Sequence, residues 1–285
     1  MSDQPVLALD VGGSSVKSAL VTNGQRIVGS VRVDAIRSTG SSTAILKTLA
    51  ATISDHLAKA TDVNRIAFAF PGPFDYEQGI SLIQNQAKYD ALYGVHLSTK
   101  LRDILEKPSL EMRYRNDAEA AILGEARYGM GTPYSRMIGL TLGTGLGSAF
   151  IVEGKVITEG DGIPPHGWLY SCMFENQRAD EVFSTRGLLA RLREHGIHEV
   201  DIASAVQNQE SNTLEQTFAS FGTDLGTFLH PFVTGFRAQA VLVTGGIAES
   251  WERFAPSLSR SLPVPVLKGT LGKRAALLGA AALYL

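Results

Sequence analysis

The stretch from Val6 to Val21, VLALDVGGSSVKSALV, contains the signals that decide the fold. Two short apolar runs flank a turn of small and polar residues, which is typical of two strands joined by a tight connection. An Asn23-Gly24 turn and the apolar run Ile27 to Val33 follow. Because Asn-Gly is a strong hairpin signal, we expect three antiparallel strands in this segment.

A second copy of this pattern begins at Met137. The run Met137 to Leu142 leads into the turn Gly143-Thr144-Gly145, and the run Gly147 to Val152 leads into a Glu153-Gly154 turn. Superposing the two copies with a one-residue offset aligns Asp10 with Thr141. A repeat of this kind indicates that a structural unit is duplicated along the chain.

The segments around the two copies alternate between helical and strand patterns. Helical spacing marks Ile45 to Leu57, Leu214 to Leu229 and the alanine-rich Arg274 to Leu283, whereas Ile66 to Phe70 and Ala240 to Val243 are strand-like runs. This alternation is typical of an α/β fold. The chain has 285 residues, more than the ~150 usual for one domain, so we expect two lobes. We place the first lobe at residues 1–115, with 272–285 packing on it, and the second lobe at 116–271.

The composition argues against several classes of protein. Apolar residues make up 44% of the chain and charged residues 19%, and the net charge is −2. Nothing therefore indicates a nucleic acid or an anionic membrane as a partner. Cys172 is the only cysteine, so no intrachain disulfide can form, and we expect this residue to be a small buried hydrophobe. Met1 to Pro5 lacks the features of a signal peptide, so we expect a cytoplasmic protein.

The two glycine turns have the chemistry of phosphate-binding sites. Asp10 ends a strand and is followed by two glycines, two serines and Lys17, so backbone N–H groups can approach phosphate oxygens closely. Asp10 can hold Mg²⁺ directly or through water. One such turn alone is more readily explained as a plain hairpin, but two matching turns suggest a clamp on a polyphosphate. Neither has the spacing of a dinucleotide-binding or P-loop motif.

Asn116 and Asp117 precede a predicted helix from Ala118 to Ala126. A carboxylate at this point can accept the proton of an alcohol during phosphoryl transfer, and we expect the helix N-terminus to keep it ionised. Asn116 can hydrogen-bond to neighbouring hydroxyls. The alternative interpretation is a helix cap, because Asn116 and Glu119 match a capping box. The two roles can coexist.

The segments that carry these patterns resemble, in order and spacing, the first phosphate, connecting, second phosphate and adenosine motifs of the ROK family of sugar kinases and repressors. They are Asp10 to Lys17, Asn116-Asp117, Leu140 to Gly147 and Val243 to Ile247. The likeness runs from about Val6 to Leu285 and is weakest from Ile163 to Ala179. It implies two actin-like, ribonuclease H-like lobes, each a mixed sheet with flanking helices, and an active site in the cleft between them.

The resemblance also implies roles for individual residues. Asp117 would be the catalytic base and Asp10 a Mg²⁺ ligand. Asn85, in the loop Ile83 to Ala87, and Glu181 would contact the sugar together with Asn116 and Asp117. The residues that would face the nucleotide are Asp10, Gly12, Gly13, Ser14, Lys17, Thr141, Gly143, Thr144 and Gly145 for the phosphates, and Gly245 and Gly246 for the adenosine.

One segment departs from the family pattern. Where the family has Gly-Glu-Ile-Gly-His, this chain has Pro165-His-Gly-Trp-Leu169. His166 replaces a sugar-binding Glu, Leu169 replaces a histidine that binds sugar or zinc, and the cysteine cluster beyond it is absent, so we expect no structural zinc. His166 is either a sugar ligand or a packed or surface residue. We expect Trp168 to pack in the core rather than to cover a sugar face.

The activity that the resemblance implies is ATP- and Mg²⁺-dependent phosphorylation of a hexose, as in glucokinases. Three alternatives stay open. The donor could be polyphosphate, because polyphosphate glucokinases have a similar Thr-Leu-Gly-Thr-Gly turn and lack the cysteine cluster. The acceptor could be a modified hexose such as an N-acetylhexosamine, because of His166, or the protein could be a non-catalytic sugar sensor. A DNA-binding repressor is disfavoured because the first strand begins at Val6, and a chaperone-like ATPase is disfavoured by Asn116-Asp117. Dimers are common among similar proteins, so a homodimer is a further expectation.

Overall fold

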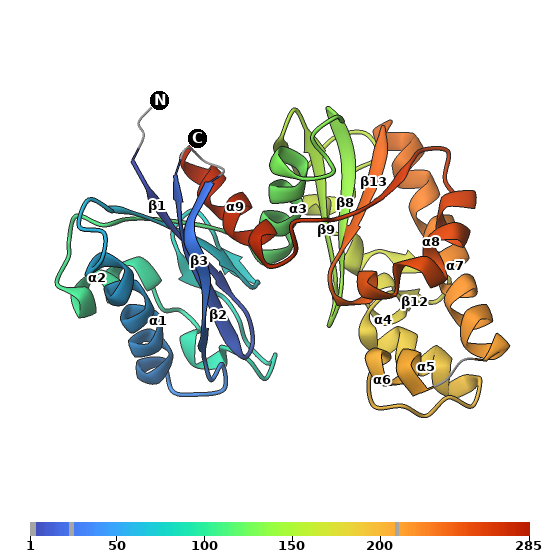
Figure 1. The fold of residues 1–285 in the computed structure, drawn as a ribbon, viewed down its shortest axis with the longest axis horizontal. Helices are drawn as coiled ribbons and strands as arrows, with labels where there is room; N and C mark the ends of the chain where they lie inside the picture. Colours follow the sequence, from blue (N-terminus) through green and yellow to red (C-terminus); the bar gives the residue numbers. More distant parts are fainter. Residues whose placement is uncertain (1–3, 23–25, 209–210) are drawn as a thin grey trace. The chain divides into compact units, whose positions relative to one another are not determined.

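The computed structural model describes residues 4–22, 26–208 and 211–285. The chain divides into two compact units (Figure 1). Unit 1 comprises Met1–Gly124 and Lys273–Leu285, and unit 2 comprises Glu125–Gly272. The described residues thus form an α/β protein of two units, as the alternating patterns predict.

Unit 1 contains a five-stranded sheet of order β3-β2-β1-β4-β7. Its strands are β1 (Val6–Val11), β2 (Ser15–Thr22), β3 (Arg26–Ala35), β4 (Arg65–Phe70) and β7 (Glu111–Asn116). β1, β2 and β3 are antiparallel neighbours, which confirms the three strands predicted from the first glycine turn. β4 and β7 add to β1 in parallel. The predicted Asn23-Gly24 turn lies outside the described residues.

The two faces of this sheet are covered by helices of different character. Large apolar side chains of β1 and β4 point to one face and pack on α1 (Ser42–Leu57), whose buried residues include those predicted from helical spacing. Ala8, Ala67 and Ala69 alternate with them and are fully or almost fully buried on the other face. There the alanine-rich α9 (Ala275–Ala281) lies against β1 and β4. α2 (Leu97–Leu105) packs beside α1.

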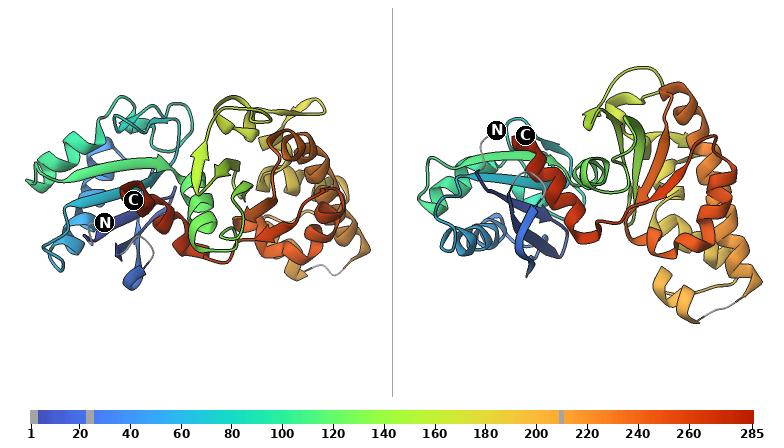
Figure 2. Two further views of the ribbon diagram at one scale, coloured as in Figure 1. Left: turned by 90° about the horizontal axis from the view of Figure 1, so that it is seen from above. Right: turned by 45° about the horizontal axis from the view of Figure 1, so that its top comes forward.

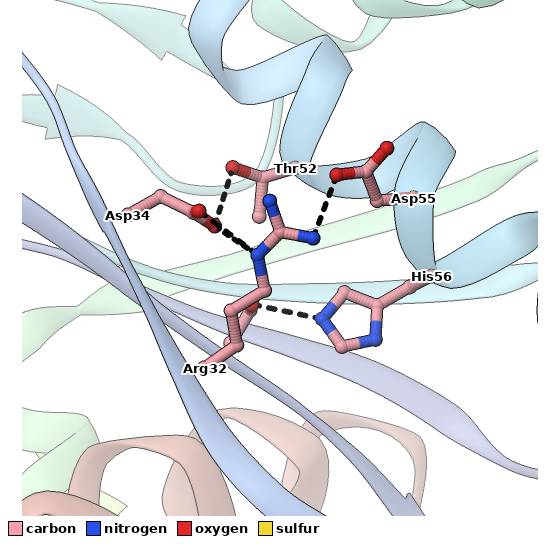
Figure 3. A network of polar contacts seen from close by, with 6 residues as sticks. Arg32, Asp34, Thr52, Asp55 and His56 are labelled. Carbon is pink, nitrogen blue, oxygen red and sulfur yellow. Dashed lines mark hydrogen bonds and ion pairs between the residues drawn. The ribbon is translucent and has the colours of Figure 1, made fainter.

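A polar network joins the edge of this sheet to α1 (Figure 3). Arg32 donates from Nε to Asp34 at 2.8 Å and from Nη1 to Asp55 at 2.7 Å, so one guanidinium bridges β3 and the helix. The ring of His56 is 2.9 Å from the hydroxyl of the buried Ser18 on β2. Burial, together with the Arg32 charge, lowers the pKa of His56 below its usual 6.5.

Unit 2 repeats the sheet of unit 1. Its strands are β8 (Arg136–Leu142), β9 (Leu146–Val152), β10 (Lys155–Ile157), β13 (Ala240–Thr244) and β14 (Val266–Lys268). The order β10-β9-β8-β13-β14, with three antiparallel strands followed by two parallel additions, matches that of unit 1. The internal repeat predicted from the sequence is therefore confirmed at the level of topology.

Helices pack on the sheet of unit 2 through a large apolar cluster. They are α4 (Ala179–Val182), α5 (Thr185–Glu194), α6 (Ile202–Asn208), α7 (Asn212–Phe236) and α8 (Trp251–Arg260). α7 and α8 lie side by side (Figure 2). They pack closely because Gly222 leaves room for the backbone of Phe254. Short two-stranded ladders complete the described strands: β5 (Phe74–Asp75) with β6 (Ile80–Ser81), and β11 (Met173–Phe174) with β12 (Gln177–Arg178).

The division between the units falls within α3 (Asp117–Tyr128), after Gly124 rather than after residue 115. The first half of α3 belongs to unit 1 because it packs on α9 with almost no side chains between the backbones. A Cβ on Gly124 would overlap the backbone of Ala275, and one on Gly279 would overlap that of Ala120. Glycine at both positions permits this close approach.

Candidate active site

The first glycine hairpin, residues 10–17 of unit 1, connects β1 to β2. Lys17 forms an ion pair with Asp10, with 2.6 Å between Nζ and Oδ2. Gly13 and Ser14 are exposed at the tip, and a Cβ on Gly13 would meet nothing within 4 Å. The hairpin therefore presents open backbone at its tip and a carboxylate with a lysine at its base.

Asn116 and Asp117 lie where β7 ends and α3 begins. β1, β4 and β7 are parallel, with Asp10 paired to Ala69 and Phe70 paired to Asn116. The carboxyl ends of the three strands therefore meet at one edge of the sheet, and this edge carries both Asp10 and Asp117. The sequence placed these residues more than a hundred positions apart; the topology brings them to one site.

The side chain of Asn116 caps α3. Its Oδ1 accepts hydrogen bonds from the backbone N–H groups of Ala118 and Glu119, at 3.1 and 3.2 Å. Its Nδ2 donates to the hydroxyl of Tyr76 at 3.1 Å. The capping interpretation of Asn116 is confirmed, and only one N–H of its amide is left to reach another group.

The pKa of Asp117 is raised above its usual 3.8. Burial is the main cause and the negative charge of Asp10 adds to it, whereas the N–H of Ala118, 2.9 Å from Oδ1, and the charge of Lys88 act in the opposite direction. The helix N-terminus favours the ionised carboxylate, as expected, but desolvation outweighs it and the net direction of the pKa is upward. Asp117 is a stronger base than an ordinary aspartate.

The long segment Gly72 to Leu92 lies on the same unit. It contains the β5–β6 ladder and a loop, residues 83–90, that carries Asn85 and Lys88. Asn85 is exposed and has a left-handed backbone, with φ of 59°. Asp90 stabilises the loop by accepting the N–H groups of Gln86 and Ala87, each at 3.0 Å. Sequence patterns gave no sign of Lys88, whose charge acts on Asp117.

The second glycine hairpin, residues 141–147 of unit 2, connects β8 to β9. Thr144 is exposed at its tip, between Gly143 and Gly145. Asp180 accepts the N–H of Leu146 at 2.7 Å, and a Cβ on Gly145 would lie 2.9 Å from the same carboxylate. The family resemblance points to the neighbouring Glu181, which is exposed on α4, and not to Asp180. The adjacent acidic pair was the only signal available.

The predicted adenosine turn borders this hairpin. Gly245 follows β13 with φ of 98°, and a Cβ there would overlap the backbone of Leu142 at the end of β8. Only glycine is suited to that combination of backbone angle and close approach. Gly246 is exposed and opens a 3₁₀ turn, Gly246–Ser250. Thr141 pairs with Thr244 across the two strands, so all these residues occupy one edge of the unit 2 sheet.

The segment that departs from the family pattern is tied to β9 by Ser148. The Ser148 hydroxyl donates to the carbonyl of Gly167 at 2.7 Å and accepts the N–H of Leu169 at 3.0 Å. Leu169 is fully buried in the core. His166 is exposed, with φ of 59°, and its ring centroid is 4.5 Å from that of Trp168.

The prediction that Trp168 packs in the core is wrong. Its side chain is 40% exposed, because Leu169 takes the inward position next to it. The indole contacts the rings of His166 and Tyr170, with centroid distances of 4.5 and 5.7 Å. Cys172 is half-buried against the core, and burial raises the pKa of its thiol.

The donor groups present fit a magnesium ion in unit 1. Lys17 occupies Oδ2 of Asp10, which leaves Oδ1 as a hard oxygen ligand. One carboxylate completed by phosphate oxygens and waters is a usual Mg²⁺ site. Within residues 4–22, 26–208 and 211–285, no three His, Cys, Asp or Glu side chains cluster closely enough to hold a metal by themselves. Across those same ranges, no helix has the length and apolar character needed to span a bilayer.

Two sheets of one topology with flanking helices, and a glycine hairpin on each, define the actin-like class of ATPase fold. Solved structures share it over nearly the whole chain. The ROK hexokinase of Thermus thermophilus superposes with a TM-score of 0.77 at 20% identity, covering 97% of this chain and 96% of that one. The ROK glucokinase of Streptomyces griseus, in complex with glucose and AMPPNP, gives 0.76 at 21% identity and covers 98% of both chains.

The chain belongs to the ROK family, whose sequence profile matches residues 6–285. Similar proteins include the glucokinase of Thermotoga maritima, 27% identical over 55% of this chain and 48% of that protein. The polyphosphate glucokinase of Mycobacterium leprae is 34% identical over 52% of this chain and 44% of its own. The N-acetyl-D-glucosamine kinase of Haemophilus influenzae is 23% identical over 97% and 98%. The chain spans about half the length of the first two of these relatives.

Proposed function

We propose that this protein is a sugar kinase that transfers the γ-phosphoryl group of ATP to a hexose hydroxyl, with Asp117 as the general base. The observation that carries the proposal is the edge of the unit 1 sheet, where Asp10 and Asp117 lie at the ends of parallel strands. Membership of a family that includes glucokinases supports the reaction class. The raised pKa of Asp117 suits a group that must accept a proton.

In the proposed reaction, the oxygen of the sugar hydroxyl bonds to the γ-phosphorus while Asp117 takes the hydroxyl proton. The bond between the γ-phosphorus and the bridging oxygen breaks, which releases ADP. Oδ1 of Asp117 accepts the N–H of Ala118, so Oδ2 is the oxygen we assign to the proton transfer. Lys88 favours the ionised form of Asp117 and offers a positive charge to the transferred group. Asn116 and Asn85 would orient neighbouring sugar hydroxyls.

The two glycine hairpins are assigned to the donor. Gly12, Gly13 and Ser14 in unit 1, and Gly143 to Gly145 in unit 2, would donate backbone N–H groups to phosphate oxygens, and Gly245 and Gly246 would border the adenosine. Asp10 would hold Mg²⁺, which spreads the negative charge of the phosphates when it is bound. Lys17 forms an ion pair with the other oxygen of Asp10, at 2.6 Å.

Glucose is the acceptor we propose first, since glucokinases are prominent among the relatives. An N-acetylhexosamine is the second candidate, because the N-acetyl-D-glucosamine kinase matches almost end to end and because the family's sugar-binding Glu is replaced by His166. A neutral or cationic imidazole changes which sugar substituent is accepted at that position. Glu181 is exposed and is the least constrained of the proposed sugar contacts.

Polyphosphate is the alternative donor. The relative with 34% identity is a polyphosphate glucokinase, and the aligned region includes about half of this chain. The Thr141-Leu-Gly-Thr-Gly145 turn has no feature that requires a nucleoside on the donor. A donor bound through phosphates alone would leave Gly245 and Gly246 without a ligand to contact.

The test is a kinase assay on the purified chain with Mg²⁺. Glucose, mannose, N-acetylglucosamine and N-acetylmannosamine are each offered with ATP and with polyphosphate, and the sugar phosphate is identified by mass spectrometry. Formation of one hexose phosphate supports the proposal and selects the donor. Calorimetric sugar binding without turnover on either donor would instead favour a non-catalytic sensor, and hydrolysis of ATP that ignores sugar would contradict both.

A further inference from the structure

Tyr89 connects the loop of residues 83–90 to the first glycine hairpin. Its side chain is fully buried, and its hydroxyl donates to the carbonyl oxygen of Gly12 at 2.6 Å across 77 positions of sequence. Its ring packs on Phe70, with centroids 5.4 Å apart, and its own N–H donates to Ser38 at 2.7 Å. The phenol therefore packs on Phe70 and donates to the hairpin, while the backbone of Tyr89 is held by Ser38.

The contact fixes the orientation of the peptide group between Gly12 and Gly13. A peptide is planar and trans, so its C=O and N–H point in opposite directions. With the Gly12 carbonyl turned inward to Tyr89, the N–H of Gly13 points outward, on the exposed side of the hairpin. Two adjacent glycines would otherwise let this peptide rotate with little steric resistance.

The backbone of the loop is strained, so the contact between Tyr89 and the hairpin must offset a conformational free energy. Asn85, Ala87 and Tyr89 all have left-handed backbones, with φ of 59°, 56° and 58°. Non-glycine residues keep such angles only where surrounding contacts determine them. Asp90 supplies two of these contacts, and the Tyr89 hydroxyl supplies the one that leads to the hairpin.

The second hairpin has an equivalent arrangement built from different atoms. Gly143 corresponds to Gly12 in the duplicated unit, and its carbonyl also accepts a hydrogen bond from a distant segment, the N–H of Thr185 at 2.7 Å. The following N–H, that of the exposed Thr144, is turned outward by the same geometry. The same peptide is anchored in both copies, once by a side chain and once by backbone.

We propose that Tyr89 is a positioning residue for the donor: it holds the Gly12–Gly13 peptide so that the Gly13 N–H is directed at a phosphate oxygen. The ligand recognised is a polyphosphate chain, free or attached to a nucleoside. Burial and the nearby charge of Asp10 raise the pKa of Tyr89, so the phenol keeps its donor proton throughout the neutral range. The inference rests on the proposed function for the identity of the donor.

The experiment compares Tyr89→Phe with the parent and with Tyr114→Phe. Tyr114 is a matched control, because it is buried in the same unit and its hydroxyl is 2.8 Å from Ser98, away from the hairpin. Binding of AMPPNP with Mg²⁺ and of inorganic tripolyphosphate is measured by calorimetry without sugar. Losing one buried hydrogen bond should weaken both ligands roughly tenfold in Y89F, with parent-like affinity in Y114F and similar losses of thermal stability in both variants.

A second readout is the amide resonance of Gly13 in labelled protein. In the parent, this resonance should shift on addition of AMPPNP. Without ligand, it should be displaced or broadened relative to the parent in Y89F and not in Y114F. Parent-like donor affinity in Y89F, equal losses in Y114F, or a parent that binds neither ligand would overturn the role of Tyr89. Hexose phosphorylation by the parent is measured separately: its absence would contradict the proposed function alone, and the binding comparison would still decide the role of Tyr89.

Discussion

Replacing Asp117 with Asn should separate activity from stability. The amide keeps an oxygen that can accept the Ala118 N–H, now at 2.9 Å from Oδ1, so the start of α3 should be preserved. What is lost is the proton acceptor. A general base usually contributes about 10²–10⁴-fold to turnover, equivalent to roughly 3–5 kcal/mol of barrier at 1.36 kcal/mol per tenfold.

The same substitution should stabilise the free protein. Burial and Asp10 raise the pKa of Asp117, so the folded state binds a proton more tightly than the unfolded state. Stability is therefore lost as pH rises from the usual Asp value of 3.8 through the raised value. D117N has no charge to bury, so its melting temperature at pH 7 should exceed that of the parent.

The assay measures kcat and KM for the sugar with ADP release as readout, beside thermal unfolding of the free protein. Glu119→Gln is the matched control, because Glu119 lies in the same helical turn and burial raises its pKa too, while its partner is Arg115 at 3.9 Å. E119Q should keep kcat within about threefold of the parent, because a partly exposed ion pair contributes little free energy. A D117N enzyme with kcat within tenfold of the parent, or a D117N protein that melts earlier, would refute the reasoning.

Three further substitutions have defined outcomes. His56 has a lowered pKa, so the free energy of unfolding should decrease as pH drops below 6.5. H56Q should reduce this decrease, measured by urea unfolding at pH 7.5 and 5.5. The fully buried carboxylate of Glu125 accepts the N–H of Leu271 at 2.6 Å; E125A should cost about 1–3 kcal/mol by removing this hydrogen-bond acceptor, seen as a lower melting temperature. The ring of Trp168 contacts that of His166 in a tilted arrangement, so W168A should raise the KM for sugar about three- to tenfold, the value of an aromatic pair, with the melting temperature nearly unchanged.

Local signals in the sequence were sufficient to predict the repeated architecture. The glycine turn after Asp10 and its copy after Thr141 located the first three strands of each sheet, because strand alternation and turn residues are properties of neighbouring positions. The cap at Asn116 was equally local, since its partners are two and three residues away. Family resemblance added the candidate roles of these residues.

Contacts between distant residues were beyond such patterns. In the sequence, Tyr89 is one apolar residue in an irregular segment. Only the fold brings its hydroxyl to the carbonyl oxygen of Gly12. Asp180 was overlooked beside Glu181 because which of two adjacent carboxylates turns toward a hairpin depends on the helix that carries them. Trp168 was assigned to the core on its residue type, whereas packing gave that place to Leu169.

The position of α9 on β1 also affects the order in which the protein can be assembled. β1 is synthesised before unit 2, yet the helix that covers its alanine face is synthesised after the whole of unit 2. Unit 2 is one continuous stretch and can complete its core as soon as it is translated. The usual N-terminal-first sequence of co-translational folding should therefore be reversed here, with the earlier-made sheet left half uncovered until the later-made unit is finished.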